Sequence, residues 1–230
     1  MHRPFIAVLA ALAVLIVTQM PGHAGKEEPG IKVDKEKRTV TIDAKIAPRK
    51  LEYLKGEIYP IEVIACWPHP KGQKAHETVV TIEAKPSDVH QALVDLGLKP
   101  GRPVVGAVKE KSQGPEVKIF LEIPQEGGDT RRVPIEKTLL DPRSNKPMPK
   151  VKWLFTGSVL EQPDPNKDEK VYGADQSGTL IAIFPVTDKT VFQTNLTWDD
   201  EKFVKLETDK KVVPKEGTPV KLVIEVPEAK

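Results

Sequence analysis

The sequence of 230 residues contains a single cysteine, Cys66, and this scarcity limits how the chain can be held together. A lone thiol cannot form an internal disulfide, and it cannot supply the four thiolates of an iron–sulfur cluster. A chain of about 200 residues can bury a core that is large enough to fold without disulfides. We therefore expect the thiol of Cys66 to be buried, bound to a metal ion or reactive.

Aromatic residues are also scarce, at 5% of the chain, and 35 basic residues nearly balance 33 acidic residues. Proteins that bind nucleic acids need a clustered basic face and aromatic rings on which bases can stack. Here lysine and glutamate alternate along most segments, as in "VDKEKRTV". The composition predicts a solvated surface of mixed charge and no nucleic-acid partner.

Several motifs of catalysis and nucleotide binding are missing from the chain. No phosphate-binding loop occurs, and Gly101 and Gly106 stand too far apart for the dinucleotide-binding fingerprint. Ser158 and Ser177 lack the glycine pattern of a nucleophile elbow. Val80 stands where a zinc-protease helix would need its second histidine, which excludes that mechanism. ATP and NAD are disfavoured as cofactors.

The first residues have the pattern of a secretory signal peptide. Arg3 precedes an uncharged run over residues 5–17, and small residues around Ala24 fit the site that a signal peptidase cleaves. This run is shorter than the about 20 apolar residues of a membrane-spanning helix. We expect residues 1–24 to be removed, residues 25–30 to form a flexible start, and the mature chain to be periplasmic or extracellular without stable membrane insertion.

The remaining chain has the periodicity of a β-rich domain. Its 22 prolines disfavour long helices, because proline removes a backbone donor and clashes inside a helix. Strict alternation of apolar residues predicts half-buried strands, as over residues 39–46 and 220–226. One segment, "PSDVHQALVDLGL", predicts a helix over about residues 86–96, with Pro86 at its start and Gly97 beyond its end.

These patterns predict an α+β, mainly β, fold of antiparallel strands with one well-defined helix, in a single domain that follows the signal peptide. Residues 31–205 are assigned to the β-rich domain. Residues 206–230 are assigned to an appended C-terminal strand or tail, because the register of this segment is not set by the pattern.

One segment, "CWPHPKGQKAHE", gathers Cys66, His69, His76 and Glu77 in the connection between two predicted strands. The two-residue gap between Cys66 and His69 occurs in zinc-binding loops, and His90 on the predicted helix is a candidate fourth ligand. His76 and Glu77 are the candidate catalytic pair, but if the following strand already begins at these residues, their side chains point to opposite faces. The alternative is a packed turn that has no catalytic or metal-binding role.

Four fragments in this order carry a resemblance to a known family: "GQKAHETVV", "PSDVHQALVDLGLKPG", "KWLFTGS" and "YGADQSGTLIAI". Through them, residues 31–194 resemble the YdjY-domain proteins, exported bacterial proteins of unknown function, and particularly the planctomycete-like branch. Some relatives are rich in cysteine and similar to ferredoxins. A chain with one cysteine cannot hold a four-thiolate cluster, which argues against electron transfer here.

The sequence favours an exported, non-enzymatic binding or structural module of the bacterial cell envelope, with an envelope component or a protein as its partner. The alternative is a metal-dependent enzyme or metal-binding protein that holds zinc or another divalent metal ion. Its metal ligands would be Cys66, His69, His76 and His90. The ranking depends on the missing motifs, because an enzyme needs several converging groups and only one loop supplies candidates.

Overall fold

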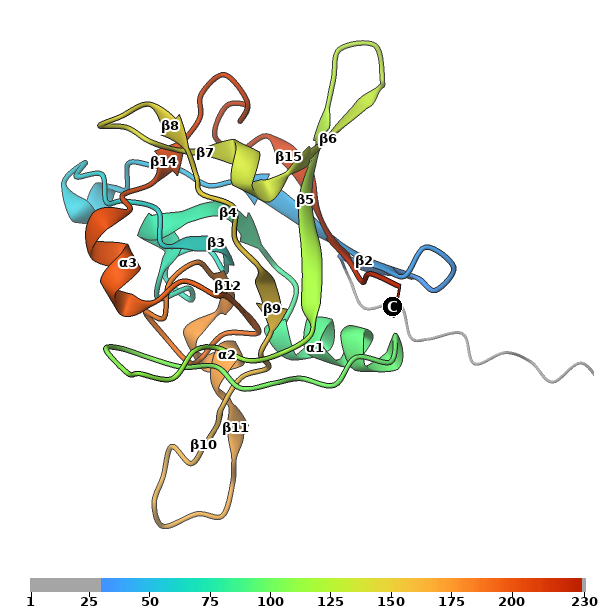
Figure 1. Cartoon of the computed structure of the whole chain (residues 1–230), viewed down its shortest axis with the longest axis vertical. Helices are drawn as coiled ribbons and strands as arrows, with labels where there is room; N and C mark the ends of the chain where they lie inside the picture. Colours follow the sequence, from blue (N-terminus) through green and yellow to red (C-terminus); the bar gives the residue numbers. More distant parts are fainter. Residues whose placement is uncertain (1–29, 229–230) are drawn as a thin grey trace, which may run out of the picture.

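A computed structural model describes residues 30–228, and its central feature is a closed β-barrel (Figure 1). The predicted signal peptide and the predicted flexible start, apart from Gly30, lie outside the described residues. The ring closes because its last strand pairs back with its first. In ring order, the eight strands are β2 (Thr39–Ile46), β15 (Pro219–Glu225), β5 (Glu116–Pro124), β9 (Trp153–Phe155), β13 (Phe192–Thr194), β12 (Thr179–Ala182), β3 (Val63–Cys66) and β4 (Thr78–Ile82).

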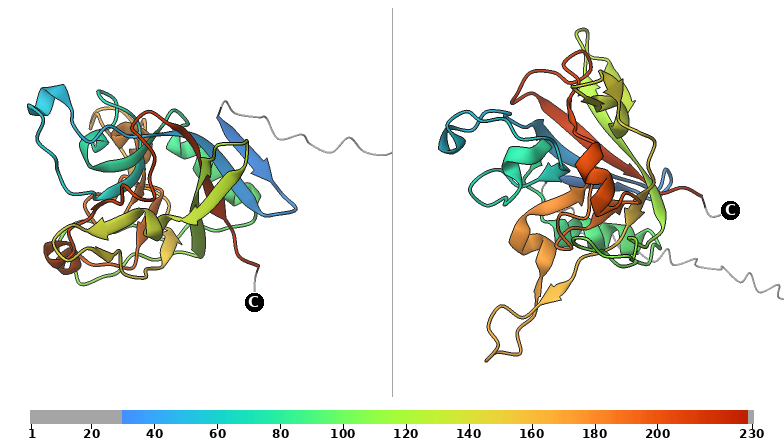
Figure 2. Two further views of the ribbon diagram at one scale, coloured as in Figure 1. Left: turned by 90° about the horizontal axis from the view of Figure 1, so that it is seen from above. Right: turned by 60° about the vertical axis from the view of Figure 1, so that its left-hand side comes forward.

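Shorter strands extend or decorate this barrel. One strand pairs with β2 and another with β5, so that both hairpins continue the wall outward. The other short strands form a small three-stranded sheet and a separate hairpin. The hairpin projects from the lower end of the barrel (Figures 1 and 2). These strands are β1 (Ile31–Asp34), β6 (Thr130–Pro134), β7 (Leu139–Asp141), β8 (Lys146–Pro147), β10 (Leu160–Glu161), β11 (Val171–Tyr172) and β14 (Glu207–Thr208).

The helices are few and short, as the proline content predicts. The α-helices are α1 (Pro86–Asp95), α2 (Gly173–Ser177) and α3 (Trp198–Phe203), and the 3₁₀ turns are η1 (Glu52–Leu54), η2 (Ala75–Glu77) and η3 (Ile135–Thr138). The predicted helix over residues 86–96 is confirmed as α1. It ends where Gly97 adopts a left-handed conformation with φ of 90°. Within residues 30–228, none of the helices has the length and apolar character needed to cross a membrane.

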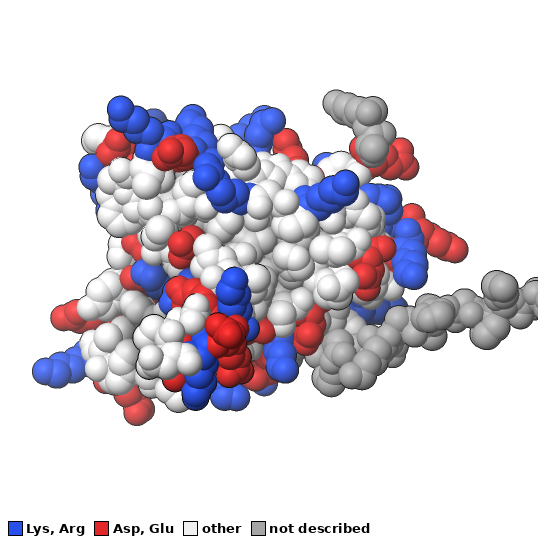
Figure 3. Space-filling view, turned by 90° about the horizontal axis from the view of Figure 1, so that it is seen from below, with Lys and Arg blue, Asp and Glu red and all other residues white. Residues whose placement is uncertain are grey.

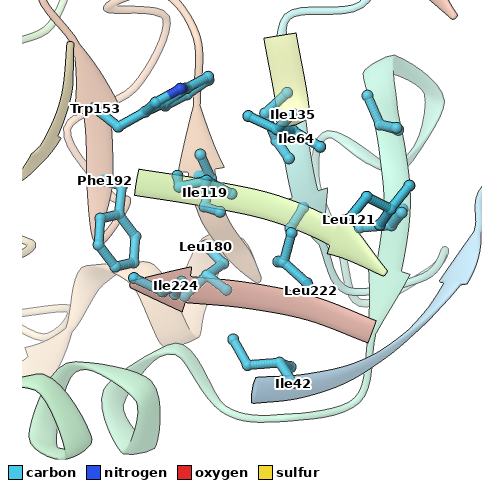
Figure 4. Packing of buried hydrophobic residues seen from close by; sticks show 14 of the residues in the cluster. Ile42, Ile64, Ile119, Leu121, Ile135, Trp153, Leu180, Phe192, Leu222 and Ile224 are labelled. Carbon is cyan, nitrogen blue, oxygen red and sulfur yellow. The ribbon is translucent and has the colours of Figure 1, made fainter. Parts of the chain in front are cut away.

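The alternation of residues on the strands fills the barrel with side chains. On β2 the apolar residues of the predicted pattern are buried, and Leu222 and Ile224 of the neighbouring β15 are fully buried. Rings from the opposite wall, including Trp153 and Phe192, pack against these aliphatic side chains (Figure 4). Burial of apolar surface at about 25 cal/mol per Å² makes this core the main source of stability.

The prediction of a mainly β fold is confirmed, but two features of the architecture were not expected. The sheet closes into a barrel, and two of its pairings, β3 with β4 and β12 with β13, are parallel rather than antiparallel. The connections that follow β3 and β12 must therefore return the chain to the end of the barrel where each strand began, instead of turning back as hairpins. Alternation indicates which residues face the core, but it does not indicate which strands are partners.

The prediction that residues 206–230 form an appended segment is wrong for the strand β15. β15 lies between β2 and β5 and pairs with β2 from Pro219 to Glu225. The short strand β14 of the same segment pairs with β7. The C-terminal strand is therefore part of the barrel wall, and without it the ring would be open.

Candidate functional site

The segment over residues 67–77 connects β3 to β4, as predicted, and is fastened at several points. The backbone N–H of Trp67 donates to the carbonyl of Gly178 at 2.8 Å, and that of Gln73 donates to the carbonyl of Ser177 at 2.9 Å. The indole of Trp67 donates to the carbonyl of Ala84 at 2.8 Å. These bonds tie the segment to α2 and to the end of β4, so its side chains have defined positions.

Cys66 is fully buried at the start of this segment. It packs with Val63 and Ala75, and its Sγ donates to the carbonyl of Trp67 at 2.9 Å. A Cβ atom on Gly72 would lie 2.6 Å from this Sγ, so only glycine allows the segment to pass so closely. Burial raises the pKa of the Cys66 thiol to about 12. The thiol is therefore neutral at pH 7, whereas metal binding and nucleophilic attack require the thiolate.

His69 lies on the outer side of the segment. Its exposed ring stacks on Tyr53 with 4.0 Å between the ring centroids. Both rings line a pocket of about 430 Å³, together with Pro48, Leu51 and Pro68. His69 thus contributes to a small, mostly apolar pocket beside the segment.

Lys74 lies at the centre of a network of charged side chains that we call the Lys74 cluster: Glu62, Lys74, His76 and Glu77. The Nζ of Lys74 is 2.7 Å from Oε2 of Glu77 and 3.2 Å from Oε2 of Glu62. The Nε2 of His76 is 3.2 Å from Oε1 of Glu77. The two carboxylates are largely buried, with side-chain exposures of 17% for Glu62 and 10% for Glu77.

The contact between His76 and Glu77 answers the question that the sequence left open about where the strand begins. Side chains of consecutive strand residues would point to opposite faces, but β4 begins only at Thr78. Both residues lie in the 3₁₀ turn η2, whose geometry brings the imidazole and the carboxylate together. The two candidate catalytic side chains are therefore in contact.

Burial and charge act against each other in the Lys74 cluster. Burial and the charge of Glu77 raise the pKa of Glu62. Burial alone would lower the pKa of Lys74, but its bonds to Glu77 and Glu62 outweigh burial and raise it. Burial, followed by the charge of Lys74, lowers the pKa of His76. At neutral pH the cation of Lys74 lies between Glu62 and Glu77, and His76 is neutral.

Arg49 ties the Lys74 cluster to distant parts of the chain and was missed by the sequence analysis. Its Nε donates to Oε1 of Glu207 at 2.9 Å, and its Nη1 donates to the carbonyl of His76 at 2.9 Å. It also donates to the carbonyl of Tyr59. Glu207 is 158 residues and His76 is 27 residues from Arg49, so no local pattern could have identified the role of this residue.

His90 lies on α1 and takes part in a different group of contacts. Its Nδ1 is 2.7 Å from the hydroxyl of Tyr172, and this hydroxyl accepts a hydrogen bond from the N–H of Ser158 at 3.2 Å. The hydroxyl proton is then free to donate to Nδ1, which places the ring proton on Nε2. Burial lowers the pKa of His90. The imidazole is neutral at pH 7 and serves as a hydrogen-bond acceptor.

The contacts of His90 belong to a larger group around the short helix α2, which we call the α2 hub: Ser87, His90, Ser158, Tyr172 and Asp175. Asp175 accepts from the N–H of Ser87 at 2.9 Å and from its hydroxyl at 2.6 Å, and so caps α1 from outside the helix. The hydroxyl of Ser158 accepts from the N–H of Ala174 at 2.9 Å, at the start of α2.

Three of the four fragments that carry the family resemblance supply residues of the α2 hub. The fourth fragment, "GQKAHETVV", is joined to the hub because Gln73 donates to Ser177 at the end of α2. The resemblance therefore rests on segments that meet at one point of the structure, where they hold α1, α2 and the segment over residues 67–77 against the barrel.

The candidate metal ligands are not brought together as one set. In the part of the chain from residue 30 to residue 228, no three His, Cys, Asp or Glu side chains are arranged so that they could hold a metal ion. Cys66 and His76 lie in or beside the segment over residues 67–77, whereas His90 belongs to the α2 hub. The zinc or other divalent metal site stays a prediction to which this geometry adds no support.

The outer wall of the barrel carries two adjoining clefts where β2, β15 and β5 form a curved sheet between the β1 and β6 extensions. Their volumes are about 600 Å³ and about 1060 Å³. Ion pairs line the floor, including Asp43 with Lys221, and Arg132 with Glu225 at 2.7 Å. Both clefts are lined by Gly30, Asp43, Glu122 and Lys221.

The chain matches one known protein family over most of its length. The family model described as the YdjY domain matches residues 31–225. The match covers nearly all of the described residues and includes β15. No curated protein and no solved structure matches the chain.

Proposed function

The chain belongs to the YdjY-domain family, and we propose that it is an exported, non-enzymatic binding module of the bacterial cell envelope. The observation that carries the proposal is that the chemically capable side chains bond to one another and to the backbone. Lys74 compensates Glu62 and Glu77, Tyr172 engages His90, and Cys66 is a buried thiol. These groups fasten loops to the barrel.

The outer clefts support a binding role. The barrel interior is occupied by core side chains, so a partner would bind on the outside of the wall. The clefts offer a concave surface: charged side chains form most of the lining of the larger cleft, and the smaller cleft also includes apolar residues such as Pro124 and Val220. Their mixture of acidic and basic residues suits a polar envelope component or a protein better than a nucleic acid, whose phosphates require a basic surface.

Export is supported by the N-terminal sequence. Arg3, the uncharged run over residues 5–17 and the small residues before Gly25 follow the order of a signal peptide and its cleavage site. Fractionation of the native host, with intact-mass measurement of the recovered protein, tests this. We expect envelope-localised protein that starts near Gly25. Cytoplasmic protein that retains Met1 would contradict the proposal.

Photo-crosslinking in the host tests the binding role. A photo-reactive amino acid at Thr41, which lines the larger cleft, is expected to capture an envelope component as a defined adduct. The same amino acid at Lys211, an exposed residue in the turn after β14, serves as the matched control. Equal labelling from both positions would argue against the cleft as the binding surface.

A further inference from the structure

The connection between α1 and β5, residues 97–114, differs in charge from the rest of the chain, and we call it the basic loop. It carries Lys99, Arg102, Lys109 and Lys111 against one acidic residue, Glu110, a net charge of four minus one, or +3. The whole chain, by contrast, has a net charge of +2. The basic loop departs from the alternation of lysine and glutamate seen in segments such as "VDKEKRTV".

The four cationic side chains of the basic loop are exposed and carry no ion pair within residues 30–228. Lys111 acts on one carboxylate of a neighbouring element: hydrogen bonds from Thr197 lower the pKa of Asp200, and the charge of Lys111 contributes least. Elsewhere many lysines have carboxylate partners, as Lys118 has Glu225 at 3.2 Å. None of the four cations is therefore neutralised by an ion pair within the described residues.

The backbone of the basic loop is held in place. The N–H of Arg102 donates to the carbonyl of Gln113 at 2.9 Å, and the N–H of Gln113 donates back at 3.0 Å. The buried amide of Gln193 accepts from the N–H of Val104 at 3.0 Å and from the hydroxyl of Ser112 at 2.7 Å. It also donates to the carbonyl of Val104 at 2.8 Å. The loop presents its side chains from a fixed backbone.

Apolar side chains lie exposed among these cations. Val105 is 44% exposed and Val108 is 46% exposed, at the part of the loop beyond the Arg102–Gln113 bridge. The basic loop runs along the lower side of the molecule in Figure 1, and Val94 of α1, at the same end, is 36% exposed. Figure 3, which views this end, shows a broad uncharged area with charged residues mainly around it.

From this combination we infer that the basic loop is a docking surface for an anionic lipid surface. Cations that lack carboxylate partners are attracted to anionic headgroups, and exposed valines enter the boundary between headgroups and acyl chains. A hydrophilic acidic polymer would bind the cations but would leave Val105 and Val108 in water. The inference deepens the proposed function by naming one partner, and it rests on that function for its cellular setting.

Co-sedimentation with vesicles tests the inference on the exported form, residues 25–230. We expect binding to phosphatidylcholine vesicles that contain phosphatidylglycerol and little binding to pure phosphatidylcholine. Each Lys or Arg near an anionic surface contributes about 1 kcal/mol, so the double substitution Lys109→Gln and Lys111→Gln should lower the partition coefficient by about 30-fold. The matched control is Lys210→Gln with Lys211→Gln, which removes the same charge from an exposed turn after β14.

The valines distinguish a lipid surface from an acidic polymer. We expect Val105→Ser with Val108→Ser to weaken vesicle binding severalfold, because the apolar contribution scales with the buried area. Val33→Ser, at a valine of β1 that is 38% exposed, should leave binding unchanged. The inference would be overturned if wild-type protein does not bind anionic vesicles, or if the valine substitutions leave binding unaffected. The second result would assign the loop to an acidic polymer.

Failure of this inference can be distinguished from failure of the proposed function. Vesicle binding in vitro does not depend on where the host keeps the protein. A cytoplasmic protein that binds anionic vesicles through the basic loop would overturn the proposed function alone. An exported protein that yields a crosslink at Thr41 but does not bind anionic vesicles would overturn the inference alone.

Discussion

The Lys74 cluster and the α2 hub hold neighbouring parts of the chain by different chemistry: the cluster ties the segment over residues 67–77 to Glu62, and the hub ties α1 to α2. The cluster uses a cation between two largely buried carboxylates. The hub uses mostly neutral groups: hydroxyls, an imidazole and backbone amides, with Asp175 as its one carboxylate. Both regions contain a histidine whose pKa is lowered by burial.

The difference between the two regions concerns what remains when one member is removed. Loss of one neutral partner from the hub leaves a dipole without its hydrogen bond, at a cost of about 1–3 kcal/mol. Loss of the cation from the cluster leaves two carboxylates facing each other in a poorly solvated place. A group of reactive residue types can thus be a structural joint, and its charge balance decides how much it contributes to stability.

The largest expected effect comes from removing β15, because both regions are attached to the barrel that this strand closes. A chain that ends at Pro214 lacks β15, so the barrel cannot close between β2 and β5. We expect no cooperative unfolding transition in urea, because folded domains have only about 5–15 kcal/mol of stability to lose. A chain that ends at Val226 retains β15 and should unfold as the wild type does. A cooperative transition in the shorter chain would contradict the closed barrel.

Substitution of Lys74 is expected to have the next largest effect. Lys74→Met keeps the aliphatic stem but leaves Glu62 and Glu77 uncompensated, so the free energy of unfolding should fall by about 2–3 kcal/mol, discounted for partial exposure. Lys71→Met is the matched control, since Lys71 is exposed on the same segment. Equal urea midpoints for the two variants would mean that the charges of the cluster do not hold the segment.

Asp175→Ala tests the α2 hub and should cost less. The substitution removes the cap of α1 and leaves the N–H and the hydroxyl of Ser87 without their acceptor. Caps are worth about 0.5–2 kcal/mol, so a loss of about 1–2 kcal/mol is expected in urea unfolding. Asp168→Ala, in the exposed turn of the β10–β11 hairpin, is the control. If both substitutions have the same small effect, the hub does not support α1.

The pH dependence should show the smallest effect, with a contribution from each region. Burial lowers the pKa of His76 and of His90 below the ordinary value of 6.5. The unfolded chain therefore binds protons more readily, and stability that is present above pH 6.5 is lost as the pH falls toward each folded pKa. His76→Gln and His90→Gln should each reduce the slope of unfolding free energy between pH 6.5 and 5. Unchanged slopes in both variants would contradict the assigned pKa directions.

Local patterns predicted the elements better than their arrangement. Alternation along β2 and the stripe of Val89 and Leu93 on α1 depend on neighbouring residues, so the sequence reveals them. Barrel closure depends on β4 meeting β2, and the place of β15 depends on partners far away in the chain. No short window of sequence contains that information.

The candidate site shows the same limit. The sequence placed Cys66, His69, His76 and Glu77 in one segment, and the structure agrees. It did not indicate Arg49, whose partner Glu207 lies 158 residues away, or that Tyr172 engages His90. It also left open whether strand geometry already applies at His76, and the 3₁₀ turn before β4 sets the contact with Glu77. Contacts between distant segments are set by the tertiary fold, so they were not predicted.

The claim that these side chains are mutual structural partners has one direct test: the free energy of unfolding of Glu62→Gln, Lys74→Met and Glu77→Gln combined. The triple variant removes the cation and both charges that it compensates, so the burial cost that destabilises Lys74→Met disappears. Urea unfolding at pH 7 should place it within about 1 kcal/mol of the wild type and clearly above Lys74→Met. A triple variant that is no more stable than Lys74→Met would contradict the account.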